Sequence, residues 1–167
     1  WTPLSGEGGH ISLSIHDELQ HQIWASLQLR FGHVSAERVL SGQGLVNIHD
    51  SLVRKRTGYW PENSLTPEQI TALGVTGQDA LASQAIELFC CWMGAAAGDL
   101  ALTIGATGGV FIGGGIAPRL GPILQASGLR RCFEDKGRFS AYLKPLPIWV
   151  IDTPLSPALE GVSTLLD

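Results

Sequence analysis

Two polar side chains lie three residues apart in a glycine-rich segment near the start of the chain. Glu7 and His10 belong to the run GEGGH, in which the glycines allow the backbone to turn tightly. A carboxylate accepts hydrogen bonds, whereas an imidazole can donate or accept them, so the pair is suited to binding vicinal hydroxyl groups. A plain surface turn has the same pattern, and the two residues alone leave both interpretations open.

Other residues whose side chains could take part in chemistry have simpler interpretations. Glu37 begins a short predicted helix, where an acidic residue complements the helix dipole. Cys90 and Cys91 are expected to pack as small apolar groups. The three cysteines are odd in number and have no CxxC spacing, and the remaining histidines have no metal-ligand spacing. The sequence therefore predicts no disulfide framework and no metal site. It favours the reducing environment of the cytosol as the setting of the protein. These histidines are His16, His21, His33 and His49.

A run of three glycines suggests a second kind of site. Gly113, Gly114 and Gly115 follow a predicted strand of four residues and precede a helix predicted to start at proline, which is the layout of an α/β nucleotide site. The dinucleotide fingerprint GxGxxG fails because Pro118 stands at its last position, and GxxxxGK[ST] is absent from the sequence. A turn without Cβ atoms lets a flat or phosphorylated ligand approach the backbone. A mere tight turn is the alternative.

The elements that must position these residues are mostly helices. Apolar residues recur every four positions from 19 to 31, which predicts an amphipathic helix that ends at Gly32. Ser35 is then predicted to cap a short helix stopped by Gly42. Helical periodicity resumes after a glycine turn and covers residues 45–55. The sequence thus predicts a helix, glycine turn, helix unit around Glu37.

The second half of the chain predicts further helices and short strands. Residues 66–69 read TPEQ, a capping box that starts a helix ended by Gly74. Residues 78–103 contain no proline and predict one long buried helix, on which Gly94 and Gly98 form a small face for close packing. The remaining predicted elements are a strand at 148–151 and a final helix at 156–166.

Size and composition limit the class of protein. The chain has 167 residues, 44% hydrophobic and 16% charged, and a mean hydropathy of +0.17. It is too apolar for disorder and lacks the long uncharged run of a membrane span. Fifteen acidic residues against eleven scattered basic ones give a charge of −4, which argues against a nucleic-acid groove. One α/β domain with a mixed sheet flanked by helices is expected. A start at Trp1 without methionine suggests a chain cut from something longer.

Four ordered segments resemble the bacterial glucokinase family. They are GEGGH from residue 6, HVSAERVLSGQGLVNIH from residue 33, GGVFIGGGIAPRL from residue 108 and FEDKGRF from residue 133. The resemblance runs along almost the whole chain. It implies a ribonuclease H-like, actin-like ATPase domain of a two-domain sugar kinase. Such an enzyme transfers the γ-phosphoryl group of ATP to the 6-hydroxyl of glucose, with Mg²⁺.

The resemblance also implies roles for the residues singled out above. Glu7, His10 and Glu37 would bind sugar hydroxyls, and the turn Gly113–Gly115 would lie against the adenosine. The family's DxGGT phosphate loop, its Asn-Asp pair with the catalytic base and its GTG segment all precede the matched region. The resemblance therefore implies no catalytic residue in this chain. Residues 1–167 would form part of the carboxy-terminal large domain, without the amino-terminal domain and without turnover in isolation.

One departure and two alternatives accompany this interpretation. The family's last glycine-rich turn corresponds to LSPALEG here, where Gly161 keeps part of the turn but Ala158 departs from it. A non-catalytic sugar-sensing module is the alternative from another functional class, and a kinase for another hexose is the second. The expected setting is cytoplasmic, with glucose and ATP as ligands, no nucleic-acid or membrane partner, and a homodimer for the full-length protein.

Overall fold

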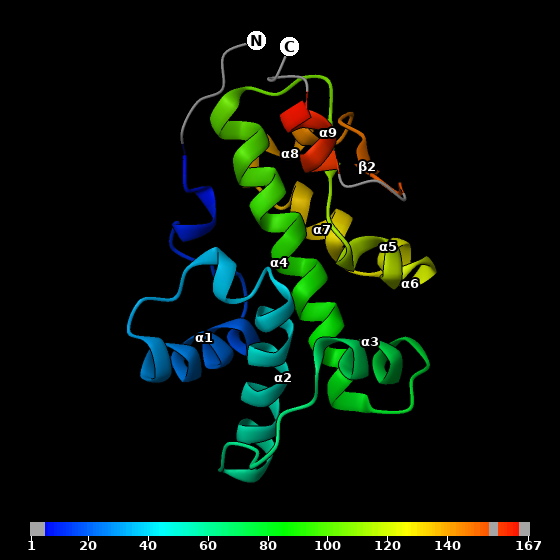
Figure 1. The fold of residues 1–167 in the computed structure, drawn as a ribbon. Helices are drawn as coiled ribbons and strands as arrows, with labels where there is room; N and C mark the ends of the chain where they lie inside the picture. The colour runs from blue at the N-terminus through cyan, green and yellow to red at the C-terminus, as the bar shows by residue number, and fades with distance from the viewer. Residues whose placement is uncertain (1–5, 154–156, 164–167) are drawn as a thin grey trace.

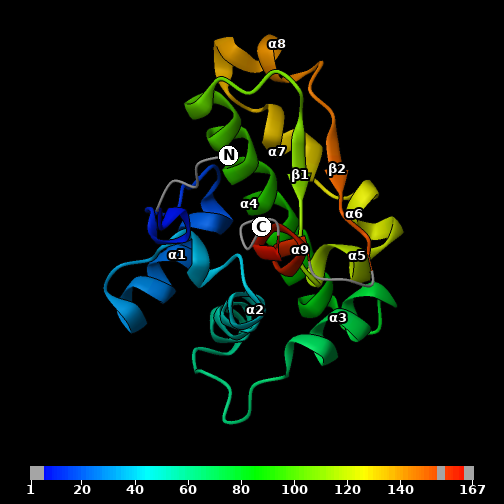
Figure 2. The same cartoon turned by 45° about the horizontal axis from the view of Figure 1, so that its top comes forward.

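The structure is a computed structural model that describes residues 6–153 and 157–163 (Figure 1). Its axis is the helix α4 (Ala80–Ile104), with the other helices packed around it. Helix α1 (Glu18–Phe31) lies beside α2 (Gly42–Thr57), and both belong to the amino-terminal half of the chain. The two strands lie together near the carboxy-terminal helices, as Figure 2 shows. The fold is therefore rich in helix, with a small sheet.

The first helix forms as its sequence predicts. The Asp17 side chain caps α1 by accepting a hydrogen bond from the Gln20 backbone N–H. Gly32 ends it with φ +72°, a backbone conformation that glycine adopts without steric cost. The short helix after it is the single 3₁₀ turn η2 (Ala36–Arg38). Its predicted cap is wrong, because the Ser35 side chain accepts no hydrogen bond from this turn.

Helix α2 begins three residues earlier than the periodicity indicates. The Ser41 side chain caps it by accepting from the Gly44 backbone N–H, so Gly42 opens the helix instead of stopping the one before. Gly44 lies inside the helix, where a Cβ atom would come within 2.3 Å of the Val39 carbonyl carbon. Glycine is needed there for close packing and not for a turn. Gly58, at φ +86°, ends α2.

Helix α3 (Pro67–Val75) has the predicted capping box, with reciprocal bonds between Thr66 and Gln69. It continues one residue past Gly74, because that glycine packs against the backbone of Ala82 in α4 and does not end the helix. The predicted long helix is confirmed as α4. Its Gly94 and Gly98 lie against backbone carbonyls of α7 (Leu129–Glu134), so the small face does allow the predicted close packing.

The sheet differs from the mixed sheet that the sequence predicts. In the described residues it consists of β1 (Val110–Ile112) and β2 (Ile148–Val150), which pair in parallel, with Val110 opposite Ile148. A parallel pair requires a crossover connection, and the helical segment between the two strands provides it. Besides α7, this segment contains α5 (Ile116–Leu120), α6 (Pro122–Ala126), η3 (Gly137–Phe139) and α8 (Ser140–Leu143).

Two details of the predicted elements differ near the carboxy terminus. Pro118 lies inside the first turn of α5 and does not start it, which is tolerated because the N–H groups of a first turn have no intrahelical partner. The last helix, α9, covers Pro157–Ser163. Its predicted continuation to residue 166 lies outside the described residues.

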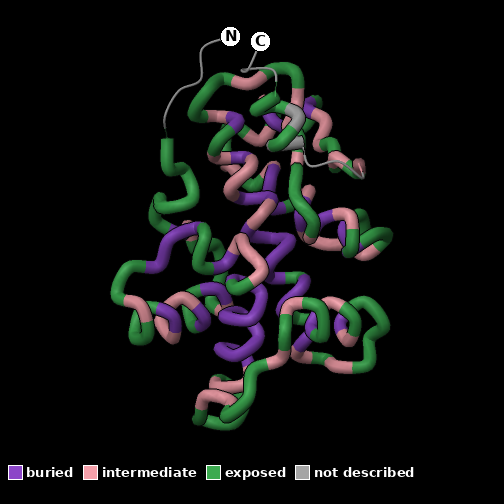
Figure 3. The backbone as a smooth tube through the Cα atoms, in the orientation of Figure 1, coloured by how far each residue is buried: buried purple, intermediate pink, exposed green. Residues whose placement is uncertain are grey.

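The core follows α4 and its neighbours, and Figure 3 shows the buried backbone along α4 and α2. The largest fully buried side chains include Trp92, Phe133 and Ile23. In the described part of the chain, one helix is long and apolar enough to cross a membrane, namely α4, which has 25 residues. It contains an apolar window of 18 residues with a mean hydropathy of 1.4. Because 67% of that apolar window is buried inside the fold, α4 has the properties of a core helix.

Candidate functional site

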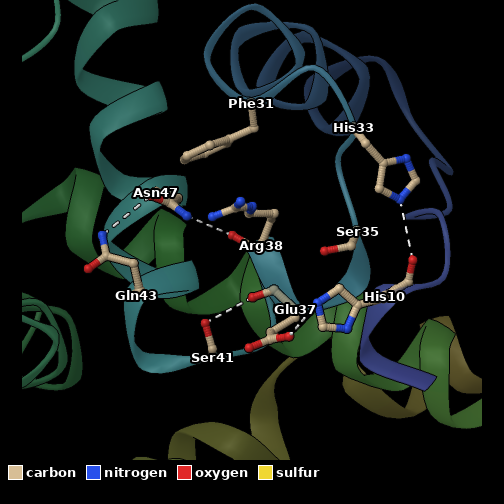
Figure 4. Close-up of a pocket in the computed structure, with 9 residues that line it drawn as sticks. All are labelled: His10, Phe31, His33, Ser35, Glu37, Arg38, Ser41, Gln43 and Asn47. Carbon is tan, nitrogen blue, oxygen red and sulfur yellow. Dashed lines mark hydrogen bonds and ion pairs between the residues drawn. The ribbon is translucent and has the colours of Figure 1, made fainter. Parts of the chain in front are cut away.

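The three residues predicted to bind hydroxyl groups meet at one place. His10 lies between two carboxylates: its Nδ1 is 3.5 Å from Glu7 Oε2, and its Nε2 is 3.6 Å from Glu37 Oε2. Figure 4 shows the His10 ring turned toward Glu37. We call Glu7, His10 and Glu37 the acid–histidine cluster. It joins residues 30 apart in the sequence into one set of hydrogen-bonding groups.

Short backbone contacts position the cluster. The 3₁₀ turn η1 (Gly8–His10) is followed by a segment that pairs with the chain before η2. The Leu13 N–H donates to the Val34 carbonyl at 3.0 Å, and the Ala36 N–H donates to the Ile11 carbonyl at 2.9 Å. These bonds hold the two segments side by side, so that Glu37 comes to lie next to His10.

The cluster faces solvent. The side chains of Glu7, His10 and Glu37 are 86%, 65% and 57% exposed. Contacts of 3.5–3.6 Å between exposed groups are weak, because water competes for both partners. The polar atoms of the cluster are therefore available to an incoming polar ligand at little cost.

The same place is hollowed. A pocket of about 430 Å³ has one wall on His10 and Glu37 and another on the first turns of α2. Sequence reasoning missed most of the other lining residues, although all except one fall within the segment from residue 33 that it singled out. Arg38 among them stacks over the Phe31 ring at 4.2 Å. The lining residues are His10, Phe31, His33, Ser35, Glu37, Arg38, Ser41, Gln43 and Asn47.

The glycine turn lies at a different place. Gly113–Gly115 follow β1, and Gly114 has φ +100°, which explains glycine at that position. Apart from each glycine and its two chain neighbours, no heavy atom of the described residues lies within 4 Å of a Cβ added to Gly114 or Gly115, so the turn is open to a ligand. Gly115 lines a pocket of about 510 Å³ with residues of α2, α3 and α5. The structure thus keeps the two predicted groups apart.

A groove extends from the cluster to β1, the strand that precedes the glycine turn. It has a volume of about 590 Å³, and its lining includes Gly8, Gly9 and Glu37 on one side and β1 on the other. Glu37 lines both this groove and the pocket, so it stands between them. The strand that leads into the glycine turn is therefore next to the cluster.

Comparison with known proteins assigns the family. The glucokinase family model matches residues 1–167. The chain belongs to the glucokinase family. Glucokinase from Chromobacterium violaceum is 49% identical over 166 residues, which are 99% of this chain and 47% of that protein. Glucokinase from Aromatoleum aromaticum is 46% identical and covers all of this chain and 50% of its own length. The chain spans about half the length of the curated relatives it matches.

Solved structures agree with the family. The crystal structure of glucokinase from an Antarctic psychrotroph is 36% identical and superposes with a TM-score of 0.86, over 98% of this chain and 50% of that one. Glucokinase from Balamuthia mandrillaris, solved in complex with glucose, has a TM-score of 0.73 at 20% identity, over 91% and 44% of the two chains. The resemblance predicted from the four sequence segments is confirmed.

The remaining candidates of this glucokinase-family chain have limited roles. Cys90 and Cys91 are buried in α4 as predicted, and burial raises the pKa of Cys90 to about 11. The part of the chain that the structure describes contains no group of three or more His, Cys, Asp or Glu side chains that could hold a metal ion. Gly161 lies within α9, whereas the side chain of Ala158 is outside the description.

Proposed function

We propose that the full-length protein carrying this chain transfers the γ-phosphoryl group of ATP to the 6-hydroxyl of glucose. The observation that carries the proposal is the acid–histidine cluster, in a chain matched from end to end by the glucokinase family. The chain would supply part of the glucose site and the adenosine side of the ATP site.

The cluster suits a polyol because its groups have complementary hydrogen-bonding properties. Each sugar hydroxyl can donate to a carboxylate of Glu7 or Glu37 and accept from an imidazole N–H of His10. Bonds to a charged carboxylate are the stronger kind, about 1.5–3 kcal/mol each. A sugar would replace the weak contacts between the three side chains and water with several such bonds. We propose these three as the substrate-binding residues.

The turn Gly113–Gly115 is proposed to bind the adenosine. It follows the carboxyl end of a parallel strand, the edge at which α/β sheets bind ligands. The absence of Cβ atoms leaves its backbone accessible to a flat ring. This layout also supports assigning residues 1–167 to the large, carboxy-terminal domain of a ribonuclease H-like, actin-like sugar kinase.

The catalytic base and the metal are proposed to depend on the rest of the protein. The described residues offer no cluster of three metal-binding side chains, so Mg²⁺ would be held by the rest of the protein. The aspartate that accepts the hydroxyl proton is expected upstream of the matched region. The chain by itself is therefore expected to give no turnover. A homodimer in the cytoplasm is the proposed assembly and location.

A coupled assay of ADP release tests the proposal. The full-length protein is assayed with glucose, mannose, fructose and N-acetylglucosamine, beside Glu37→Gln and the matched control Glu62→Gln, which changes an exposed glutamate in the loop after α2. We expect a strong preference for glucose, lost in Glu37→Gln and kept in the control. Glucose binding without turnover of any sugar would instead support the sensing module. Preferred turnover of another sugar would make the protein a kinase for that hexose.

A further inference from the structure

We propose that Ser41 and Asn47 are positioning residues for Glu37. Both lie in or next to the first turns of α2, and both bond to the backbone of the turn that carries Glu37. The inference rests on the proposed function, because it assigns how the sugar-binding carboxylate is held. It concerns two residues that do not themselves need to touch the sugar.

Ser41 connects the start of α2 to the Glu37 peptide. Its hydroxyl donates to the Glu37 carbonyl oxygen at 2.9 Å and accepts from the Gly44 backbone N–H at 2.9 Å. The second bond is the helix cap, which satisfies an N–H group that has no partner inside the helix. One hydroxyl therefore fixes the direction of the helix and the carbonyl of the substrate-binding residue together.

Asn47 holds the next peptide. Its side chain is buried, its Nδ2 donates to the Arg38 carbonyl at 2.9 Å, and its Oδ1 accepts from Gln43 Nε2 at 3.4 Å. Figure 4 shows both contacts as dashed lines from Asn47, at the left of the view. The nitrogen and the oxygen of the Asn47 side-chain amide each make a hydrogen bond, so the amide cannot rotate freely. The Arg38 carbonyl therefore has a fixed partner.

Val39 completes the attachment. Its backbone lies so close to Gly44 that a Cβ atom there would be 2.3 Å from the Val39 carbonyl carbon. Residues 37, 38 and 39 are thus held in succession by Ser41, Asn47 and Gly44.

This attachment matters because the Glu37 side chain is itself weakly held. The side chain is 57% exposed, and its carboxylate lies 3.6 Å from His10 Nε2. The position of the Glu37 carboxylate is therefore determined by the backbone of the turn that carries it. Binding groups that are fixed in advance avoid an entropic cost when the ligand binds. Loosening the turn should weaken sugar binding and leave the nucleotide side unaffected.

Steady-state kinetics of the full-length protein test the inference with Ser41→Ala, Asn47→Ala and Ser41→Thr. Loss of one hydrogen bond is expected to raise the KM for glucose about 3- to 10-fold, with the KM for ATP unchanged. Threonine can keep both bonds of the serine hydroxyl, so Ser41→Thr should restore the wild-type KM. Ser83→Ala is the matched control. The Ser83 hydroxyl also donates to backbone carbonyls, those of Gly74 and Asp79, but neither residue lines the pocket.

The outcomes separate the inference from the proposed function. An unchanged KM for glucose in Ser41→Ala overturns the positioning role, and so does an equal rise in both KM values, which would indicate general damage. Ser41→Ala decides the matter alone if Asn47→Ala does not fold. No turnover of any sugar by the wild type, or an unaffected Glu37→Gln variant, refutes the proposed function itself.

Discussion

Replacing Gly44 by alanine tests whether close packing of α2 on the preceding turn positions the site. The added Cβ would lie 2.3, 2.4 and 2.7 Å from the carbonyl carbon, carbonyl oxygen and Cα of Val39. Ordinary carbon contacts are about 3.5–4.0 Å. The backbone of Val39 would therefore have to move by more than about 1 Å, and backbone atoms cannot rotate away as a side chain does.

Two opposing effects set the magnitude. Alanine favours a helix interior over glycine by about 0.8–1.0 kcal/mol. Overpacking of a well-packed region costs about 1–3 kcal/mol. Gly42→Ala is a matched control on the same helix, because its Cβ would lie 3.6 Å from Pro67, an ordinary contact. The control should gain up to about 1 kcal/mol, and Gly44→Ala should be less stable than the control by about 1–3 kcal/mol.

Urea unfolding at 25 °C measures the free energies of unfolding of Gly44→Ala and Gly42→Ala. The assay of ADP release measures the KM of each variant for glucose. The displaced turn should raise the KM for glucose at least about tenfold in Gly44→Ala, because a shift of 1 Å is costly for bound geometry. The control should keep the wild-type KM. The reasoning is refuted if Gly44→Ala is as stable as Gly42→Ala, or if its KM for glucose is unchanged.

Three further predictions concern stability. Thr66→Ala removes the capping box of α3 and should cost about 1 kcal/mol in urea unfolding; no loss would show that tertiary contacts alone hold this helix end. Arg130→Met removes donors to the Leu146 and Lys144 carbonyls and to Glu134, and should cost about 2–3 kcal/mol; an unchanged unfolding midpoint would contradict this. Burial raises the pKa of Cys90 from 9.0 to about 11, so the folded state holds this proton more tightly than the unfolded state does. The contribution of the Cys90 thiol to the free energy of unfolding should be fully present below pH 9 and should be lost between pH 9 and 11. The free energy of unfolding of Cys90→Ala should therefore fall less over that pH range.

Local sequence signals determined most of the helices. The caps at Asp17 and Thr66 act within one turn, and the glycine at 32 requires only its own backbone angle. These features depend on neighbours in the sequence, which is why periodicity and cap residues predict them. The long helix α4 was predicted from an apolar stretch without proline, and both strands were predicted from short apolar runs.

Three glycines were misread as turn or stop residues, and two of them serve packing that is not local. Gly42, Gly44 and Gly74 have the residue type of helix stops, yet α2 and α3 include them. Gly44 and Gly74 are explained by backbone atoms of other segments that approach within 3 Å of where a Cβ would be. Only the folded chain supplies those neighbours. The parallel direction of β2 likewise depends on the path of the crossover, which no short pattern encodes.

For the site, the sequence determined the residue types and the family resemblance, and the tertiary structure decided their arrangement. Glu7 and His10 were predicted as a pair and Glu37 separately, and the family resemblance implied one shared role for all three. That His10 lies between the two carboxylates follows from backbone pairing of residues 11–13 with 34–36. The proposed role of Ser41 depends on the earlier start of α2, which makes this residue the cap of the helix. A hydrogen bond needs atoms in contact, and contacts between separate segments exist only once the chain has folded.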